Sequence, residues 1–235
     1  MAQEVLMQVI ARIHTPFSQK FGIPRQSGLA DTPGTIVFEP EFRDPNALRG
    51  LEEYSHLWLV WQFSQARQTW SPTVRPPRLG GNRRMGVFAT RSPYRPNPIG
   101  LSCVRLQGVD LHTDQGPVIH VLGADLKDGT PILDIKPYLA YADSFPEARG
   151  GFTDRVARRT LRVEDPGNLL EGLASAEREA LGQVLACDPR PSYQADPHRI
   201  YGMAYGAWEV RFRVEDQTLY VLELTGKRRD GESND

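Results

Sequence analysis

The stretch Arg83-Arg84-Met85-Gly86-Val87-Phe88-Ala89-Thr90-Arg91-Ser92-Pro93-Tyr94-Arg95-Pro96-Asn97-Pro98-Ile99-Gly100-Leu101-Ser102 decides how this chain is built. Its two ends have the composition of β-strands, but three prolines lie between them. Proline lacks the N–H that a sheet ladder requires, so the middle is predicted to be a stiff loop. Because a stiff loop loses little conformational entropy on binding, Arg91, Tyr94, Arg95 and Asn97 are candidates for holding an anionic or planar ligand. A solvated, proline-rich surface turn is the alternative.

Positive charge is concentrated around this loop. Between Glu53 and Asp110 the sequence has no acidic residue and eight arginines, namely Arg67, Arg75, Arg78, Arg83, Arg84, Arg91, Arg95 and Arg105. The whole chain has a formal net charge of −1, so the remainder carries −9. This asymmetry favours a polyanion or a nucleotide as ligand, and guanidinium groups suit planar, bidentate recognition.

The overall composition is that of a globular protein, with 40% hydrophobic and 24% charged residues in 235. The sequence has neither a long apolar run nor a basic-then-apolar leader, so we expect a cytoplasmic protein without a membrane span. Cys103 and Cys187 are far apart, and the five histidines lack ligand spacing. We therefore expect no disulfide and no metal cofactor.

Short strand-like runs, separated by Gly and Pro turns, fill the first 140 residues. They are expected at residues 5–13, 35–39, 54–63, 103–110, 118–125 and 132–139. This pattern favours a β-barrel or sandwich over alternating strands and helices, and no GxGxxG follows a strand. The run 54–63 is apolar on both faces, which is typical of a central or barrel strand.

The pattern changes after residue 145. A polar connector is expected over 146–165, followed by a small α+β domain over 166–235. Leucines and alanines from Leu169 to Leu185 recur at helical spacing and predict one amphipathic helix. Two strands are expected at 206–214 and 218–224, before a charged tail. The predicted fold is mainly β, with an N-terminal β-barrel domain over 1–145 and a small α+β C-terminal domain.

Several motifs together resemble the TrmO family. They are Gly86 to Gly100, Pro24-Arg25-Gln26, Ser55-His56-Leu57-Trp58, Arg75-Pro76-Pro77-Arg78-Leu79-Gly80-Gly81, Asp128-Gly129-Thr130-Pro131 and Asp134-Ile135-Lys136-Pro137-Tyr138. The resemblance covers nearly the whole chain, including the segment from Asp188 to Tyr193. It implies a β-barrel methyltransferase that uses S-adenosylmethionine (SAM) and works as a homodimer. The implied substrate is N6 of threonylcarbamoyladenosine (t6A) at position 37, just 3′ of the anticodon of threonine tRNA.

The resemblance also implies which residues bind SAM. They are Pro24, Arg25, Gln26, Ser64, Gln65, Arg91, Leu101, Asp125, Leu126, Lys127 and Asp128. Relatives often have histidine where this chain has Ser64, so a backbone contact is expected there. The tRNA phosphates or the threonyl carboxylate are expected to bind Arg75, Arg78, Arg83, Arg84 and Arg95. Either the tRNA-binding surface extends over four further arginines, or their side chains are solvated. These are Arg149, Arg155, Arg158 and Arg159.

The expected chemistry is methyl transfer from a sulfonium to a nitrogen, which mainly requires alignment and exclusion of water. N6 of t6A is conjugated to a carbonyl and must lose a proton, so a base within reach would assist. Asp134, Asp128 and Tyr138 are the candidates, in that order, and Asn97 is expected to accept a hydrogen bond from N6–H.

Two other functions fit the same residues. A SAM-binding sensor without catalysis predicts cofactor affinity and no methylated product. A nucleic-acid chaperone that acts through the arginines alone predicts RNA binding that is indifferent to cofactor.

Overall fold

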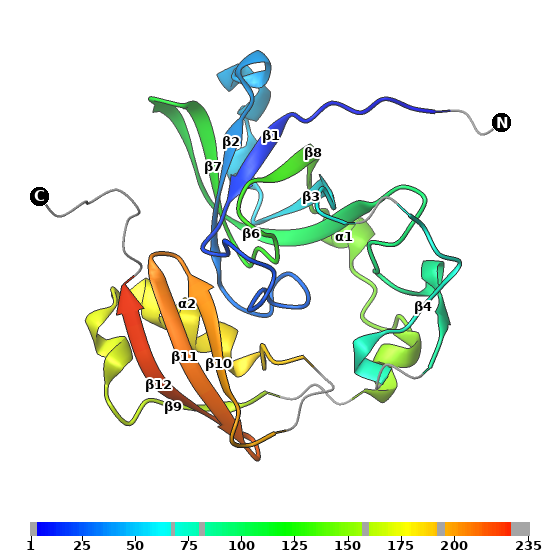
Figure 1. The fold of residues 1–235 in the computed structure, drawn as a ribbon. Coiled ribbons are helices and arrows are strands. Elements are labelled where there is room, and N and C mark those ends of the chain that lie inside the picture. Colours follow the sequence, from blue (N-terminus) through cyan, green and yellow to red (C-terminus); the bar gives the residue numbers. More distant parts are fainter. Residues whose placement is uncertain (1–3, 67–68, 80–82, 157–159, 192–195, 227–235) are drawn as a thin grey trace, which may run out of the picture.

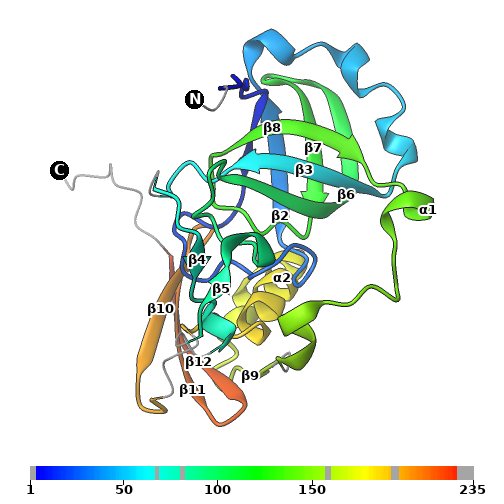
Figure 2. The ribbon, with the colours of Figure 1, turned by 90° about the vertical axis from the view of Figure 1, so that its right-hand side faces the viewer.

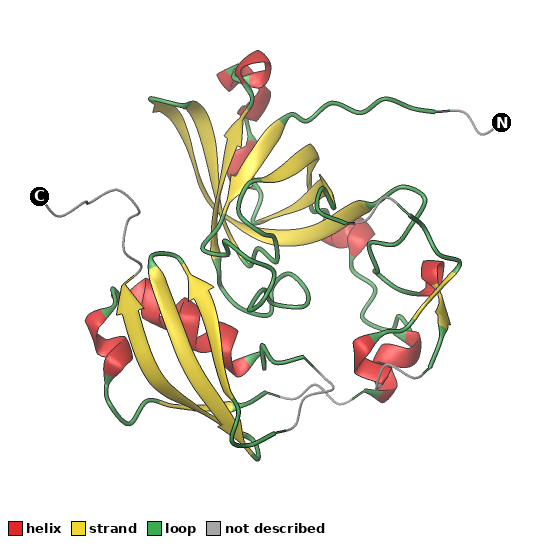
Figure 3. Cartoon of the chain, viewed as in Figure 1, coloured by secondary structure: helices red, strands yellow, loops and turns green. Residues whose placement is uncertain are grey.

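The computed structural model describes residues 4–66, 69–79, 83–156, 160–191 and 196–226. The described chain forms a β-barrel, a second β-rich unit and a small lobe beside the barrel (Figures 1 and 3). The fold is mainly β, as the sequence predicts. No helix in these ranges is long and apolar enough to cross a membrane.

Six antiparallel strands close the barrel in the order β1-β2-β7-β6-β3-β8. They are β1 (Ala11–His14), β2 (Pro33–Phe38), β3 (His56–Gln62), β6 (Ile99–Thr113), β7 (Gly116–Leu122) and β8 (Thr130–Pro137). Side chains alternate between the inside and the outside of a barrel strand. In β3 the alternation buries Leu57, Leu59 and Trp61, whereas Trp58 and Val60 lie partly exposed on the outer face. The predicted apolar strand 54–63 is therefore a barrel strand.

Three short 3-10 helices connect β2 to β3. They are η1 (Pro40–Phe42), η2 (Pro45–Leu48) and η3 (Leu51–Glu53). The Asp44 carboxylate accepts the backbone N–H of Asn46 at the start of η2, and this bond lowers the pKa of Asp44. Asp44 is therefore the N-cap of η2.

The proline-rich stretch folds into a lobe, which we call the β4–β5 lobe and define as the described part of residues 69–98. It contains β4 (Thr73–Val74) paired with β5 (Met85–Gly86), and the 3-10 helices η4 (Pro77–Leu79) and η5 (Val87–Ala89). Strand structure resumes only at Ile99, because the prolines interrupt it as predicted. The lobe lies beside one end of the barrel (Figures 1 and 2).

The second unit is a four-stranded sheet in the order β10-β11-β12-β9, with a helix on one face (Figure 3). Its strands are β9 (Arg162–Glu164), β10 (Ile200–Tyr205), β11 (Trp208–Glu215) and β12 (Thr218–Gly226). The helices after the barrel are α1 (Ala140–Asp143), η6 (Gly151–Arg155), η7 (Leu169–Gly172) and α2 (Ser175–Ala186). β9 belongs to this sheet although it lies in the stretch expected as connector, and β10 had no predicted counterpart.

The single helix predicted from Leu169 is wrong in its first part. The Asp165 carboxylate accepts the N–H groups of Leu169 and Leu170 and holds them in the 3-10 helix η7. Leu173 is then extended, with φ −86° and ψ 153°, so α2 begins only at Ser175. The apolar spacing of this segment is satisfied by two short helices that share one core.

The loop between β1 and β2 joins the two units. Phe17 and Ala30 of this loop are buried in the core of the C-terminal unit. The Phe17 and Tyr205 rings pack in a T-shaped arrangement with their centroids 5.7 Å apart. The backbone N–H of Gly206 donates to Pro16 O at 2.7 Å. Figure 1 shows this loop in blue, reaching from the barrel toward β10 and β11. The loop that carries Pro24-Arg25-Gln26 is therefore held by the C-terminal unit.

Candidate functional site

The barrel has a split between the first half of β6 and the chain that follows β7. β6 pairs with β3 from Ile99 to Arg105, but with β7 only from Arg105 onward. The loop segment 26–28 fills this split, because Cys103 N donates to Ser27 Oγ at 3.2 Å and Gly28 N donates to Gly123 O at 2.9 Å. The split brings together chain segments that the sequence separates widely.

The backbone of Leu101 faces this split. Phe63 N donates to Pro98 O and Leu106 N donates to Ser55 O, which sets the alternation of hydrogen bonds between β3 and β6. By that alternation, Leu101 turns its N–H and C=O away from β3, on the same side as the Cys103 N–H. No partner for these two Leu101 groups is seen in the described chain. The Leu101 side chain lies on the outer face and is 51% exposed, so this residue offers its backbone to a ligand in the split.

Asp125 is the carboxylate at the split. Its Oδ1 accepts the Ser102 hydroxyl at 2.6 Å, and Ser102 Oγ accepts the Trp61 indole N–H at 3.0 Å. Burial raises the pKa of Asp125, while the hydrogen bond from Ser102 and the nearby positive charge of Arg91 oppose this rise. A partly buried carboxylate with one oriented oxygen is suited to bind hydroxyl or amino groups of a ligand.

Arg91 connects the proline-rich stretch to the β1–β2 loop. Its Nη1 donates to Gln26 Oε1 at 2.5 Å, and the neighbouring Arg25 donates from Nη2 to Arg190 O at 3.1 Å. Arg190 is paired with Asp188 at 2.8 Å, within the Asp188-Pro189-Arg190-Pro191 segment of the C-terminal unit. Pro24 is buried beside them. The predicted cofactor residues 24–26 and Arg91 are therefore brought together.

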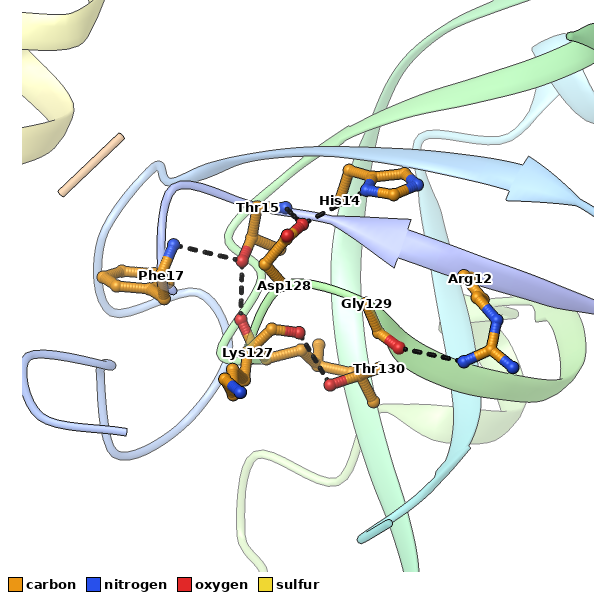
Figure 4. Close-up of polar contacts among 9 residues, drawn as sticks. Arg12, His14, Thr15, Phe17, Lys127, Asp128, Gly129 and Thr130 are labelled. Carbon is orange, nitrogen blue, oxygen red and sulfur yellow. Dashed lines mark hydrogen bonds and ion pairs between the residues drawn. The ribbon is translucent and has the colours of Figure 1, made fainter. Parts of the chain in front are cut away.

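The turn from Asp125 to Asp128 is pinned to the end of β1 (Figure 4). Asp128 Oδ1 accepts Thr15 N at 3.1 Å and lies 3.2 Å from His14 Nδ1, while Thr15 Oγ1 donates to Leu126 O at 2.9 Å. Thr130 Oγ1 donates to Lys127 O at 2.7 Å. These bonds fix the turn against the barrel, so the expected role of Asp128 includes a structural one.

A cavity of about 390 Å³ opens at this end of the barrel. Six of the predicted cofactor residues line it: Ser64, Gln65, Asp125, Leu126, Lys127 and Asp128. Lys20, Ile23, Trp61, Pro93 and Tyr94 also contribute to its wall. The volume is in the range of small-molecule and cofactor sites. The cavity therefore joins the strand end at Ser64, the pinned turn and the proline-rich stretch.

Among the four catalytic candidates, Asp128 lines this cavity. Asp134 lies on the outer face of β8, opposite Val60 in the pairing with β3, and its Oδ2 is 2.9 Å from Lys136 Nζ. Tyr138 packs its ring 5.9 Å from Trp58, and Asn97 is exposed in the loop before β6. Leu101 is also opposite Val60, so Leu101 and Asp134 flank β3 on the same outer face, about 10 Å apart at the usual strand spacing. Asp134 and Tyr138 therefore face outward, away from the cavity wall.

The predicted tRNA-binding arginines lie in the β4–β5 lobe. The side chains of Arg75, Arg83 and Arg84 are exposed, and Arg95 is partly buried because its Nη1 donates to Thr90 O at 2.8 Å. Arg78 lies in η4. Of the four connector arginines, Arg158 and Arg159 lie outside the described residues.

Reasoning from the sequence missed the residues that hold Asp125. Ser27, Trp61 and Ser102 had no distinctive spacing, and their convergence depends on the register of β3 and β6. One signal was present at Gly100, where an added Cβ would lie 2.2 Å from the Trp61 ring. A glycine within a strand often marks such a close approach.

Comparison with known proteins places this site in a family. The family model for the tRNA-methyltransferase O N-terminal domain matches residues 12–144, and the model for the TrmO C-terminal domain matches residues 160–227. The chain is 42% identical over 228 residues to the tRNA (adenine(37)-N6)-methyltransferase of Escherichia coli K12, covering 92% of this chain and 95% of that protein. It is 39% identical over 247 residues to the mouse protein of the same name, covering 100% of this chain and 54% of that protein.

Solved structures agree with these relatives. The crystal structure of TrmO from Pseudomonas aeruginosa superposes with a TM-score of 0.78 at 35% identity, covering 96% of this chain and 99% of that chain. Both units and the residues of the candidate site thus fall within matched regions, and the chain belongs to the tRNA-methyltransferase O (TrmO) family.

Proposed function

We propose that this enzyme transfers the methyl group of SAM to N6 of t6A at position 37 of threonine tRNA. Its SAM-dependent tRNA adenine-N6-methyltransferase activity follows from the family and from relatives of that name that match over most of the chain. The choice of t6A and of threonine tRNA goes further and rests on the resemblance of the motifs. The observation that carries the proposal is the convergence of the pinned turn, the β1–β2 loop and Arg91 at one split of the barrel.

The residues at the split fit SAM by their chemistry. The unpaired N–H and C=O of Leu101 form a donor and an acceptor side by side, which suits the edge of an adenine. The Asp125 carboxylate suits ribose hydroxyls or an ammonium, and the guanidinium of Arg91 suits the methionine carboxylate. When bound, SAM supplies an electrophilic methyl on a sulfonium. Gln26 accepts a hydrogen bond from Arg91 and orients its guanidinium, and Ser27 accepts one from Cys103 N and holds the loop against β6. Trp61 and Tyr94 form a wall that excludes water.

The proton on N6 requires an acceptor. We retain Asp134 as the first candidate, because it shares the outer face of β3 with Leu101 and its carboxylate is accessible. Tyr138 and Asp128 follow, and Asn97 is proposed to accept a hydrogen bond from the single N6–H of t6A before that proton leaves. If Asn97→Ala keeps full turnover with intact SAM binding, that last role is wrong.

We further propose a homodimer in the cytoplasm, where its tRNA substrate is found. Tyr141 of α1 and Phe145, shortly after the end of this helix, are 89% and 64% exposed. They provide apolar surface of the kind that dimers bury. Light scattering of the wild-type protein and of Tyr141→Ala tests this assembly.

The deciding experiment incubates the protein with radiolabelled SAM and total tRNA from a strain that lacks its own enzyme. A parallel reaction uses tRNA that never received the threonylcarbamoyl group. Label in the first reaction and none in the second supports t6A as the substrate. Label in both reactions shows that unmodified adenine is accepted. SAM binding by calorimetry without label in either reaction supports the sensor alternative instead.

A further inference from the structure

Three aromatic side chains of the β4–β5 lobe are exposed to solvent. The exposed fractions are 74% for Phe88, 54% for Trp70 and 43% for Tyr94. Aromatic side chains usually contribute to stability by being buried in a core or an interface. Three exposed rings on one small lobe forgo this contribution in the free protein. Several exposed aromatic side chains on one lobe are typical of a binding surface.

Backbone hydrogen bonds hold the three aromatic positions in one local structure. Ser71, next to Trp70, donates its N–H to Tyr94 O at 3.2 Å, and Val87, next to Phe88, donates its N–H to Pro72 O at 3.0 Å. Tyr94 also lines the cavity. The lobe that carries the three rings therefore reaches the candidate cofactor site through Tyr94.

The same lobe carries positive charge, and its own sequence has no acidic residue to neutralise it. No acidic residue occurs between Glu53 and Asp110. Within the described part of the chain, five arginine side chains of the lobe form no ion pair with a carboxylate. They are Arg75, Arg83, Arg84, Arg91 and Arg95. The Arg95 guanidinium lies 5.8 Å from the centre of the Phe88 ring.

Aromatic rings and arginines are common in interfaces between proteins too, so the charge of the lobe decides the class of partner. Its sequence has arginines and no acidic residue, which favours a polyanion. Single-stranded nucleic acids are bound in this way, by aromatic rings that stack on bases and cations that follow the phosphates. An adenine that is methylated at N6 must also leave its stack to reach a cofactor. Both considerations favour an unpaired RNA loop.

We propose that Trp70, Phe88 and Tyr94 form a stacking platform for the unpaired bases that flank the target adenine in the anticodon loop. Arg75, Arg83 and Arg84 bind the adjacent phosphates. This inference rests on the proposed function and adds the residues that recognise the loop. Stacking contributes about 1–3 kcal/mol per base, so it adds affinity that does not depend on salt as the phosphate contacts do.

The test measures binding of a fluorescent anticodon stem-loop RNA in the absence of SAM, so that no turnover is needed. Phe88→Leu and Trp70→Leu are each expected to weaken binding about 5- to 150-fold. Phe88→Tyr keeps a ring and is expected to bind like the wild type. Tyr54→Leu, which removes an exposed ring outside the lobe, is the matched control and should also leave affinity unchanged. The salt dependence separates the two kinds of contact: Arg84→Gln should reduce the slope of log K against log salt by about one, and Phe88→Leu should leave it unchanged.

Equal RNA affinity of wild type, Phe88→Leu and Trp70→Leu would overturn the platform. Loss of dimerisation in Phe88→Leu, with RNA affinity retained, would assign the aromatic cluster to a protein interface and would also overturn it. If the wild type binds the stem-loop through these rings but transfers no methyl group, the proposed function fails and the platform stands. If methyl transfer occurs and the leucine variants bind RNA normally, only the platform fails.

Discussion

Ser102 Oγ donates to Asp125 Oδ1 over 2.6 Å, and the direction of this bond is fixed by the surroundings. A hydroxyl has one hydrogen, and Ser102 Oγ already accepts the indole N–H of Trp61. Its hydrogen therefore points to Asp125. Ser102 is buried in the barrel, so it orients the Asp125 carboxylate at the split without contacting a ligand itself.

Removing this hydroxyl tests whether orientation of Asp125 matters for the cofactor. Ser102→Ala deletes one hydrogen bond to a charged group, which is worth about 1.5–3 kcal/mol. We expect calorimetry to show SAM binding weakened about 10- to 150-fold, with the KM for tRNA changed much less. Ser144→Ala, at an exposed serine, is the control. An unchanged Kd for SAM in Ser102→Ala would show that Asp125 needs no such support.

Gly100 tests the same arrangement from its other end. An added Cβ would meet Trp61 Cε2 at 2.2 Å, so Gly100→Ala must displace the indole. We expect a loss of about 1–3 kcal/mol in the free energy of unfolding, together with weaker SAM binding. Gly108→Ala is a matched control on the same strand, because no atom lies within 4 Å of its added Cβ. Equal effects of the two substitutions in denaturant titrations would contradict the contact with Trp61.

Burial of Asp125 also predicts how stability depends on pH. Its pKa in the folded protein is raised above the ordinary value of 3.8, chiefly by burial. The folded state then binds the proton more tightly than the unfolded state. The free energy of unfolding therefore falls as pH rises from about 3.8 through the raised folded pKa, by at most about 1.4 kcal/mol per pH unit.

Asp125→Asn removes this contribution. The difference in unfolding free energy between wild type and variant should change across that window and be constant above it, as measured by urea titrations at several pH values. A difference that rises with pH, instead of falling, would mean that hydrogen bonds outweigh burial at this carboxylate. SAM binding should weaken in the variant at pH 7.

Much of the barrel was predictable because local rules decide it. The prolines of the stretch 93–98 forbid strand structure, and a run that is apolar on both faces, as in 54–63, is typical of a central or barrel strand. The order of the six strands was not predictable, since periodicity shows which residues face inward and not which strand lies beside which. The helix predicted from Leu169 failed because the side chain of Asp165 competes for its first N–H groups, which apolar spacing does not reveal.

Some residues of the candidate site could likewise be predicted from the sequence, and others could not. The motif resemblance found the residues around the split, including Arg91 and the turn 125–128. It did not find Ser102 or Trp61, because a serine and a tryptophan in strands are ordinary residues until the register places them together. Nor does any sequence pattern show that the C-terminal unit holds the loop of residues 24–26, which depends on the burial of Phe17.

Phe17 provides a test of that support. Its side chain is fully buried in the C-terminal core, so Phe17→Ala should cost about 3–5 kcal/mol of stability and loosen the loop that carries Arg25 and Gln26. Leu181→Ala removes a fully buried side chain from the same core without altering the loop itself. We expect both variants to lose stability in thermal unfolding, and Phe17→Ala to lose clearly more SAM affinity at a temperature where both are folded. Equal SAM affinities would indicate that the C-terminal unit stabilises the fold without positioning the cofactor loop.

The two aspartates proposed to accept the proton from N6 occupy different surroundings, and this difference predicts different kinetics. Asp128 Oδ1 is occupied by Thr15 N and His14, so Asp128→Asn can keep its acceptor for the backbone and should retain kcat within about threefold. Asp134 contacts Lys136 on an accessible face, and loss of a general base typically costs 10²–10⁴ in rate. We therefore expect Asp134→Asn to lower kcat at least about 100-fold with little change in SAM affinity. Single-turnover assays with saturating SAM separate the two, and a larger loss of kcat in Asp128→Asn than in Asp134→Asn would reverse the order of the candidates. Asp128→Ala, which removes the acceptor for Thr15 N, should instead weaken SAM binding through the turn.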